Sequence, residues 1–240
     1  MLMAAVAGGV CAAAGVLACG VRQPSCTLLA PSVHRGPRDC PSIALTFDDG
    51  PSESTPRLLE LLELYRAPAT FFQCGANVRR LPHIARRIAA AGHEIGNHTD
   101  SHPLLALRSP GVIREELRRA QHAIEDAADS TPRLFRAPYG ARWFGLRAAQ
   151  REFHLTGVMW SVLGRDWKWP APRIAQIVER GAANGAIICL HDGRELHAAP
   201  DIRATLEAVR RFLPVLLERG FQFQTVSQLL CPMYPVCPRT

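Results

Sequence analysis

Ionisable side chains recur in this sequence at the points where apolar runs end. The first run, residues 43–47, leads directly into Asp48-Asp49-Gly50-Pro51, which places two carboxylates next to each other. Neighbouring side chains of a strand point to opposite faces, so both carboxylates can serve one site only where the strand is distorted. The same string also makes a good turn, and by itself it does not separate a turn from a catalytic pair.

Two histidines, His98 and His102, follow a second apolar run with a spacing of four residues. In a helical turn this spacing would place both imidazoles on one face, able to hold one metal ion. Two surface histidines of a loop are the alternative. With one aspartate from the first string they form a His-His-Asp set, which leaves coordination positions open for water and substrate. The sequence therefore predicts a divalent-metal site that polarises a carbonyl and acidifies water.

Three further apolar runs also end on ionisable groups, within Arg136-Ala137-Pro138-Tyr139-Gly140, Asp166-Trp167 and Leu190-His191-Asp192. Taken singly, each group is explained equally well by a salt bridge or a turn. Barrel enzymes place their active sites at the C-terminal ends of the strands, so the recurrence indicates one catalytic face. The other histidines lack this context and are interpreted as structural or solvated, at positions 34, 83, 93, 122, 154 and 197.

From residue 41 onward, short apolar runs alternate with amphipathic stretches, which is typical of β-α units around a parallel sheet. The runs predict strands at residues 43–47, 69–73, 94–96, 134–136, 156–160, 186–190 and 221–225. The stretches between them predict helices at residues 55–66, 78–91, 111–128, 145–152, 172–183 and 201–219. We therefore expect an α/β fold, a distorted (β/α) barrel of about seven parallel strands with its active site at the C-terminal strand ends.

Composition narrows the classes of partner. The chain has 240 residues, 48% of them hydrophobic and 20% charged, which is ordinary for a globular core. Its net charge of +7 is spread along predicted helices, so we expect solvated helix faces and no nucleic-acid partner. A basic surface would also suit an anionic polymer such as a cell-wall glycan. Among eight cysteines without zinc-knuckle spacing, Cys74 and Cys189 are predicted to be buried, whereas Cys26, Cys40, Cys231 and Cys237 could pair in an oxidising compartment.

The chain divides into an apolar leader and linker at residues 1–40, one catalytic domain at residues 41–230 and a short Pro/Cys tail at residues 231–240. Residues 1–21 carry no charge and are about long enough to cross a bilayer, which predicts a membrane anchor or a signal. The missing basic start and the arginines at 22, 35 and 38 argue against export. We expect a membrane-anchored or cell-envelope protein, with a cytoplasmic protein or a flexible leader as alternatives.

Taken in order, the motifs resemble those of the polysaccharide deacetylase family. The matching strings are Thr46-Phe47-Asp48-Asp49-Gly50-Pro51, His98-x-x-x-His102, Arg136-x-Pro138-Tyr139-Gly140, Asp166-Trp167 and Leu190-His191-Asp192. The family includes chitin, chitooligosaccharide and peptidoglycan N-acetylglucosamine deacetylases as well as acetylxylan esterases, on a distorted seven-stranded barrel. The resemblance covers residues 41–230 and implies a metal-dependent hydrolase that removes N-acetyl groups from glycans containing N-acetylglucosamine.

The resemblance also implies roles for individual residues. Asp49, His98 and His102 would hold the metal, which is usually zinc and can be replaced by cobalt or nickel. Asp48 would be the general base that activates water, and His191 would be the general acid that protonates the leaving amine. The substrate would be an N-acetylated glycan of the peptidoglycan or chitin type, and we expect a monomer.

Six further positions complete the implied site. Asp166 would pair with His191, Arg136 would orient an active-site carboxylate, and the backbone N–H of Tyr139 would help to hold the oxyanion. The side chains that would contact substrate are those of Trp167, Tyr139, Cys189 and Leu190.

The chain departs from the family pattern in two places, and both bear on specificity. Ser161 and Leu163 stand where members often have acidic residues, and Cys189 stands where they often have leucine. A smaller Cys189 would widen the pocket for the acetyl methyl group. Two other classes stay open. An O-acetyl polysaccharide esterase would use the same metal and base with a leaving alkoxide, and a non-catalytic glycan-binding barrel would be expected to lack Asp48 or a metal ligand.

Overall fold

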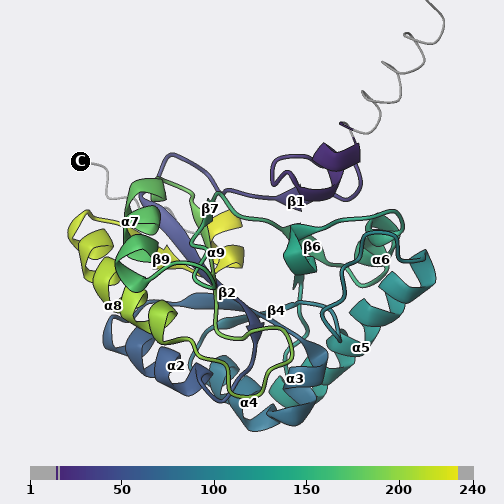
Figure 1. Cartoon of the computed structure of the whole chain (residues 1–240), viewed down its shortest axis with the longest axis horizontal. Coiled ribbons are helices and arrows are strands. Elements are labelled where there is room, and N and C mark those ends of the chain that lie inside the picture. The colour runs from purple at the N-terminus through teal and green to yellow at the C-terminus, as the bar shows by residue number, and fades with distance from the viewer. Residues whose placement is uncertain (1–14, 16, 232–240) are drawn as a thin grey trace, which may run out of the picture.

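The computed structural model describes residue 15 and residues 17–231 (Figure 1). In this part of the chain one curled sheet runs in the order β1-β6-β5-β4-β3-β2-β8-β7, and β9 pairs with β2 beside this path. Every ladder between these strands is parallel. Helices surround the outside of the sheet (Figure 1). The predicted α/β class and distorted parallel barrel are confirmed.

Seven strands correspond to the predicted ones: β2 (Ser42–Gly50), β3 (Ala69–Gln73), β4 (Glu94–Asn97), β5 (Leu134–Phe135), β6 (Thr156–Val158), β8 (Ile187–His191) and β9 (Gln222–Gln224). Two more, β1 (Ser32–Val33) and β7 (Val162–Leu163), were not expected. Each has two residues, too few for the alternation of polar and apolar side chains that reveals a strand. They pair with β6 and β8, respectively.

Strand β2 forms the centre of the sheet, and all nine of its residues are buried. It pairs with β3 and β8, and its first residues also pair with β9. Ile43, Leu45 and Phe47 lie in the main hydrophobic core between sheet and helices. Because strand side chains alternate between faces, Thr46 and Asp48 lie on the other face, inside the barrel. The apolar pattern of β2 therefore directs Asp48 inward.

The helices are α2 (Thr55–Leu64), α3 (Gly75–Arg80), α4 (Pro82–Ala90), α5 (Pro110–Ala128), α6 (Leu146–Glu152), α7 (Ala171–Gly181), α8 (Arg203–Glu218) and α9 (Val226–Leu230), with a 3-10 turn, η1 (Pro138–Gly140). The helix expected at residues 78–91 is two helices, because Pro82 starts a new one after Leu81. Proline is favoured in a first helical turn, where its missing N–H costs nothing. Helix α9 was not expected at all; a capping box between Thr225 and Gln228 starts it.

Packing of the helices supplies most of the apolar core. The buried face of α8 contributes Phe212, Leu213 and Leu216, all fully buried. Burying one such side chain contributes about 1.5–3 kcal/mol relative to leaving it in water. Val226 and Leu229 of α9 belong to a smaller cluster with Ala44 inside the barrel. Both clusters hold the strands at fixed spacing, which fixes where their C-terminal ends project side chains.

Residues 20–30 pack on the barrel. Arg142, which is 1% exposed, donates hydrogen bonds from its guanidinium to the carbonyls of Gln23 and Cys26. Leu29 and Ala30 are buried. Packing against the barrel therefore begins before residue 41, where the sequence places the start of the catalytic domain.

Some predictions concern residues outside the described part of the chain. Most of the apolar segment 1–21, nearly all of the tail 231–240 and Cys237 belong to this group. Within residues 15 and 17–231, no helix has the length and apolar character needed to cross a membrane. The predicted burial of Cys74 and Cys189 is confirmed.

Candidate active site

A cavity of about 570 Å³ opens at the C-terminal ends of β2, β4 and β8. Most of the predicted site residues line it: Asp48, Asp49, His98, His102, Tyr139, Trp167, Cys189 and His191. Arg136 and Asp166 lie directly behind, each bonded to a residue of this lining. The geometry thus gathers groups from five separate strand ends into one cavity, as the sequence predicts.

The two adjacent aspartates reach one cavity because the strand is distorted between them. The register of β2 against β3 shifts between Asp48 and Gly50. Asp49 adopts the left-handed conformation with φ 71°. This backbone region is uncommon for residues other than glycine. The strand is therefore distorted at the point where Asp48 and Asp49 must both reach one site.

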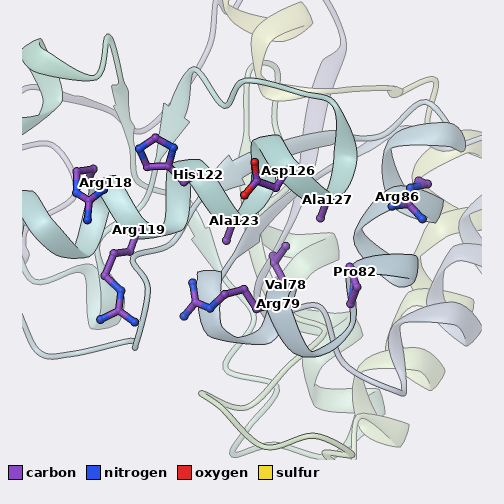
Figure 2. A pocket seen from close by; sticks show the side chains of 10 residues that line it. All are labelled: Val78, Arg79, Pro82, Arg86, Arg118, Arg119, His122, Ala123, Asp126 and Ala127. Atoms are coloured by element: carbon purple, nitrogen blue, oxygen red, sulfur yellow. The ribbon is translucent and has the colours of Figure 1, made fainter.

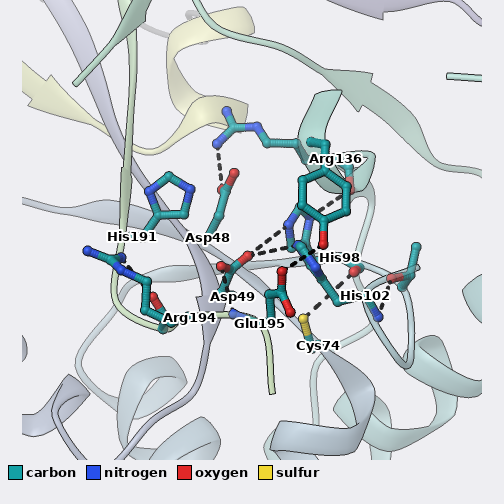
Figure 3. Close-up of polar contacts among 12 residues, drawn as sticks. Asp48, Asp49, Cys74, His98, His102, Arg136, His191, Arg194 and Glu195 are labelled. Atoms are coloured by element: carbon teal, nitrogen blue, oxygen red, sulfur yellow. Dashed lines mark hydrogen bonds and ion pairs between the residues drawn. The ribbon is translucent and has the colours of Figure 1, made fainter. Parts of the chain in front are cut away.

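Asp49 and the two histidines form a compact trio (Figure 3). Its carboxylate Oδ1 lies 3.3 Å from His98 Nε2 and 3.1 Å from His102 Nε2. All three side chains are buried. Burial alone would raise the pKa of Asp49, but hydrogen bonds from His102 and His98 hold that pKa well below its usual value. Three donor atoms that face one another in this way fit a divalent cation.

The orientation of His98 is set by its other nitrogen. His98 Nδ1 lies 2.7 Å from the carbonyl oxygen of Arg136, which can only accept, so Nδ1 carries the hydrogen. Nε2 is therefore the nitrogen that faces Asp49 and would bind the metal. Such a bond behind a ligand is the usual way in which proteins orient a metal-binding imidazole.

A second group of donor atoms, from Asp48, Cys189 and His191, also lies close enough to suggest a metal. Two of these residues already have charged partners: Asp48 bonds Arg136, and His191 bonds Asp166. Burial raises the pKa of the Cys189 thiol well above its usual value, which opposes the thiolate that a metal requires. The Asp49 trio is therefore the better metal site.

The loop that carries the two histidines is not helical, contrary to the helical turn considered from their spacing. Thr99 and His102 both have positive φ, 68° and 56°. Local hydrogen bonds hold this path: Thr99 N donates to Asn97 Oδ1 at 2.9 Å, and His102 N donates to Thr99 Oγ1 at 3.2 Å. The four-residue spacing brings the imidazoles together through a tight loop and not through a helix face.

Asp100 anchors this loop from behind. Its buried carboxylate accepts two hydrogen bonds from Arg79, at 2.7 and 3.0 Å, and pairs with Arg119 at 3.0 Å. The two arginines come from α3 and α5 and face the same groove (Figure 2). The backbone N–H of Asp100 also donates to Glu116 at 3.0 Å. The metal-binding loop is thus tied to two helices, a role that the sequence did not reveal.

Asp100→Asn is expected to weaken metal binding and lower stability, because a neutral amide loses the charge-assisted bonds to both arginines. The arginines are about half exposed, so a loss of about 1–3 kcal/mol is reasonable. Thermal unfolding and a metal titration measure the two effects. Asp126→Asn, in the same groove, is the matched control, because the described residues give Asp126 no ion pair. Equal behaviour of the two variants would show that Asp100 does not anchor the loop.

Asp48 is positioned by Arg136, which is fully buried. Arg136 Nη1 donates to Asp48 Oδ1 at 2.7 Å and to Thr46 Oγ1 at 2.7 Å. Its remaining donors reach the carbonyls of Val158 and Met159, each at 3.2 Å. With its donors committed in several directions, this guanidinium fixes the Asp48 carboxylate in one orientation.

His191 is held by Asp166 on the opposite side of the cavity. Its Nδ1 lies 2.7 Å from Asp166 Oδ1, and its backbone N–H donates to Asp166 Oδ2 at 2.9 Å. Burial alone would lower the pKa of His191, but the charge and hydrogen bond of Asp166 raise that pKa to about 9. Trp167 packs edge-on against His191, with ring centroids 5.0 Å apart. His191 Nε2 is left to face the cavity as a proton donor.

Of the predicted substrate contacts, Leu190 lies outside the cavity lining. Cys189 and His191 line the cavity, whereas Leu190 belongs to the main hydrophobic core. Alternation along β8 explains this, because consecutive strand residues face opposite sides. The sequence contained this signal, since β8 itself was predicted correctly.

Several lining residues were not predicted. Glu195 accepts a hydrogen bond from the Tyr139 hydroxyl at 2.8 Å, and its backbone N–H donates to Asp49 Oδ2 at 2.9 Å. Tyr139 in turn packs edge-on against His102, with ring centroids 4.8 Å apart. No motif marks Glu195 in the sequence. The other unpredicted lining residues are Arg22, Gly140, Trp160, Leu163, Arg194 and His197, of which His197 was interpreted as structural or solvated.

Comparison with known proteins identifies the family of this chain. The model of the polysaccharide deacetylase family matches residues 35–158. A chitooligosaccharide deacetylase from Bradyrhizobium sp. (strain ANU 289) is 39% identical over 197 residues, which cover 78% of this chain and 90% of that protein. The chain therefore belongs to the polysaccharide deacetylase family, a family of hydrolases.

Solved structures place both active and inactive relatives near this chain. A peptidoglycan N-acetylglucosamine deacetylase superposes with a TM-score of 0.76 at 33% identity, covering 82% of this chain and 91% of that chain. A pseudoenzyme of carbohydrate esterase family 4 from Bacillus anthracis superposes with the same TM-score at 29% identity. The superposition covers 85% of this chain and 69% of the pseudoenzyme chain. The fold alone thus does not establish catalysis, which depends on the residues of the site.

Proposed function

We propose that this chain is a metal-dependent hydrolase that removes N-acetyl groups from glycans containing N-acetylglucosamine. One observation carries the proposal: a single cavity brings together the Asp49 trio, the Asp48–Arg136 pair and the His191–Asp166 pair. A ligand set, a base and an acid around one cavity are what hydrolysis of an amide requires. A barrel that only binds glycans has no need of such pairs.

Asp49, His98 and His102 would hold the divalent cation, which we take to be zinc, with cobalt or nickel as substitutes. Nitrogen and carboxylate donors in a buried trio suit these ions. When bound, such an ion supplies a Lewis acid that polarises the acetamide carbonyl and lowers the pKa of water. The chain's own residues carry out the proton transfers.

In the proposed reaction, Asp48 accepts a proton from the water that attacks the acetamide carbon. Arg136 holds this carboxylate in place and does not itself touch the substrate. His191 donates the proton on Nε2 to the departing nitrogen, because an amine leaves poorly unless it is protonated. Asp166 supports the charged form of His191. Breaking the C–N bond then yields acetate and a free amino sugar.

Tyr139 and Trp167 would complete the site on the substrate side. We assign stabilisation of the oxyanion to the backbone N–H of Tyr139, and loss of one such donor typically costs about 3 kcal/mol in comparable sites. Trp167 is half-exposed beside His191 and would form a wall for the sugar ring. Cys189, buried 3.4 Å from Asp48, would border the acetyl methyl group.

The relatives support a proposal for the substrate and for the place of the activity. Peptidoglycan and chitooligosaccharide deacetylases among them support a glycan of the cell-wall or chitin type, and we place the activity at the cell envelope. Membrane association through residues 1–21 stays a prediction. That the chain acts as a monomer also stays a prediction.

Acetate release from three substrates, measured side by side with metal-loaded protein, tests the proposed function. Chitooligosaccharides and peptidoglycan carry N-acetyl groups, whereas acetylxylan carries O-acetyl groups. We expect release from at least one N-acetylated glycan at a higher kcat/KM than from acetylxylan. Activity on acetylxylan alone would identify an O-acetyl esterase, and no release from any of them would favour a binding barrel.

His98→Ala and His102→Ala are each expected to abolish stoichiometric metal binding, because one donor of a three-residue set is lost. Elemental analysis after dialysis against zinc measures the metal content. His83→Ala, at an exposed position of α4, is the control and should keep the metal. Full metal content in both site variants would refute the assignment of the ligands.

A further inference from the structure

Arg22 lines the same cavity as the metal trio, although it lies outside the part of the chain that matches the family, residues 35–158. We propose that Arg22 forms a subsite for a carboxylate carried by the glycan, beside the N-acetyl group that is hydrolysed. The enzyme would then prefer an acidic glycan to a neutral one. This inference rests on the proposed function and specifies its substrate class.

The guanidinium of Arg22 is not committed to a protein partner. Within residues 15 and 17–231, Arg22 takes part in no ion pair and no side-chain hydrogen bond. The other cavity arginine, Arg194, donates to the carbonyls of Gly193 and Asp166. A guanidinium presents five N–H donors in a planar fork that matches a carboxylate. Arg22 is thus the cation of this cavity that is available to a ligand.

The backbone around Arg22 is fixed to the active-site loop. Arg142 follows η1 by two residues, and its backbone N–H donates to the carbonyl of Val21 at 2.9 Å. Its buried guanidinium bonds the carbonyls of Gln23 and Cys26 on the other side. These bonds bracket Arg22 and tie its position to the loop that carries Tyr139. Because its backbone is fixed, Arg22 loses less conformational entropy on binding a ligand than an arginine on a mobile segment would.

The segment is also closed on itself and anchored further along. The backbone N–H of Gln23 donates to the carbonyl of Cys19, and the backbone N–H of Cys26 donates to the carbonyl of Gln23, each at 3.0 Å. Arg147 donates to the carbonyls of Thr27 and Leu28, at 3.1 and 3.3 Å. Residues on both sides of Arg22 are therefore held against the barrel.

The acidic side chains of the cavity already have partners, which leaves the Arg22 cation to pair with an anion of the ligand. Asp48 is paired with Arg136 and Asp166 with His191, while the Glu195 carboxylate accepts from Tyr139. The Asp49 carboxylate faces the two histidines of the metal set. The acidic groups of the cavity thus have partners, whereas the charge of Arg22 has none among the described residues. Its natural complement is an anionic group on the substrate.

The chemistry of glycans suggests where such a carboxylate comes from. Chitin-type oligomers are neutral, whereas in peptidoglycan N-acetylglucosamine alternates with a sugar that carries a lactyl ether. The lactyl carboxylate is free when the stem peptide has been removed, and it is an amide when the peptide is attached. A carboxylate of the stem peptide is then the other source.

Matched substrates test the subsite. The first is a peptidoglycan-derived oligomer with free lactyl carboxylates, and the second is the same oligomer with those carboxylates converted to methyl amides. The third carries intact stem peptides, and a chitooligosaccharide of equal length is the neutral reference. The variants are Arg22→Gln, which removes the charge, and Arg22→Lys, which keeps it. Arg180→Gln, an exposed arginine at the C-terminal end of α7, is the control.

We expect Arg22→Gln to lower kcat/KM for the free-carboxylate oligomer about 3- to 10-fold, through KM, relative to its methyl amide. Arg22→Lys should recover part of this difference, and added salt should reduce it. The same loss with the stem-peptide oligomer instead would place the carboxylate on the peptide. An equal change for acidic and neutral oligomers, or a loss as large in Arg180→Gln, would overturn the subsite.

Equilibrium binding separates this inference from the proposed function. Calorimetric titration of the metal-loaded protein with the free-carboxylate oligomer and its methyl amide requires no turnover. Tighter binding of the acid than of the amide, lost in Arg22→Gln, supports the subsite whatever the reaction. Equal affinities overturn it. If no glycan releases acetate but the acid still binds more tightly than the amide, the proposed hydrolysis is contradicted and the Arg22 subsite is not.

Discussion

Asp48→Asn is expected to lower the turnover of the metal-loaded enzyme by about 10²- to 10⁴-fold, the usual contribution of a general base. The amide keeps the size of the side chain and its capacity to accept a hydrogen bond from Arg136, so the protein should fold. Metal content should stay near that of the natural chain, because the metal set is Asp49, His98 and His102. Added zinc should recover nothing, since the lesion lies in proton transfer.

Asp49→Asn provides the contrast within the same string. A neutral amide is a weaker ligand than a carboxylate for a divalent cation, so metal binding should fall first and excess zinc should restore part of the activity. Metal content and deacetylation rate are measured for both variants across a zinc titration. Equal rescue of the two variants, or natural turnover in Asp48→Asn, would show that the roles of the two aspartates are reversed or shared.

The second large effect concerns the alkaline side of the pH profile. His191 must be protonated to act as the acid, and in the protein without metal its pKa is raised to about 9. Activity should therefore fall as pH rises through this region, at a somewhat lower pH when a divalent cation adds positive charge nearby. Asp166→Asn removes the charge that raises this pKa, while burial still lowers it. The alkaline limb should move to lower pH.

The expected loss of activity follows from the fraction of His191 that is protonated. For each pH unit by which the pKa of His191 falls, activity on the alkaline side falls about 10-fold at a given pH. The profile of kcat/KM is measured for the natural chain and for Asp166→Asn, with Asp201→Asn as a control at an exposed ion pair. An alkaline limb that stays in place in Asp166→Asn would contradict the pairing. A folded state with a raised histidine pKa also loses stability as pH rises from about 6.5 to about 9, which gives an independent readout.

The fold was predictable wherever a strand was long enough to show its pattern. Residues 69–73 were predicted with the bounds that β3 has. The two-residue strands β1 and β7 carry no such pattern, because their pairing is decided by distant partners. Helix α9 is short and is defined by its cap and by packing inside the barrel, which a search for amphipathic stretches does not detect.

The residues of the site likewise fall into those that a local pattern predicts and those that it does not. Most side chains that belong to a motif lie together in the cavity, with Leu190 as the exception, and the distortion that strand alternation requires for a shared site lies between Asp48 and Gly50. Residues that act through tertiary contacts were not: Asp100 behind the metal loop, Glu195 across from Tyr139, and Arg22 from a segment far away in the sequence. Their roles depend on which loops meet in space, and no local spacing encodes that.

The origin of the oxygen in the released acetate shows whether an activated water cleaves the N-acetyl group. Metal-loaded protein is incubated with an N-acetylglucosamine oligomer in water enriched in oxygen-18, and both products are analysed by mass spectrometry. Hydrolysis by an activated water predicts acetate with one labelled oxygen for every free amino group formed, and almost none of either in Asp48→Asn. Hydrolysis by a water that Asp48 activates would be contradicted by any of three results: release of unlabelled acetate, equal yields from Asp48→Asn, or no free amino groups.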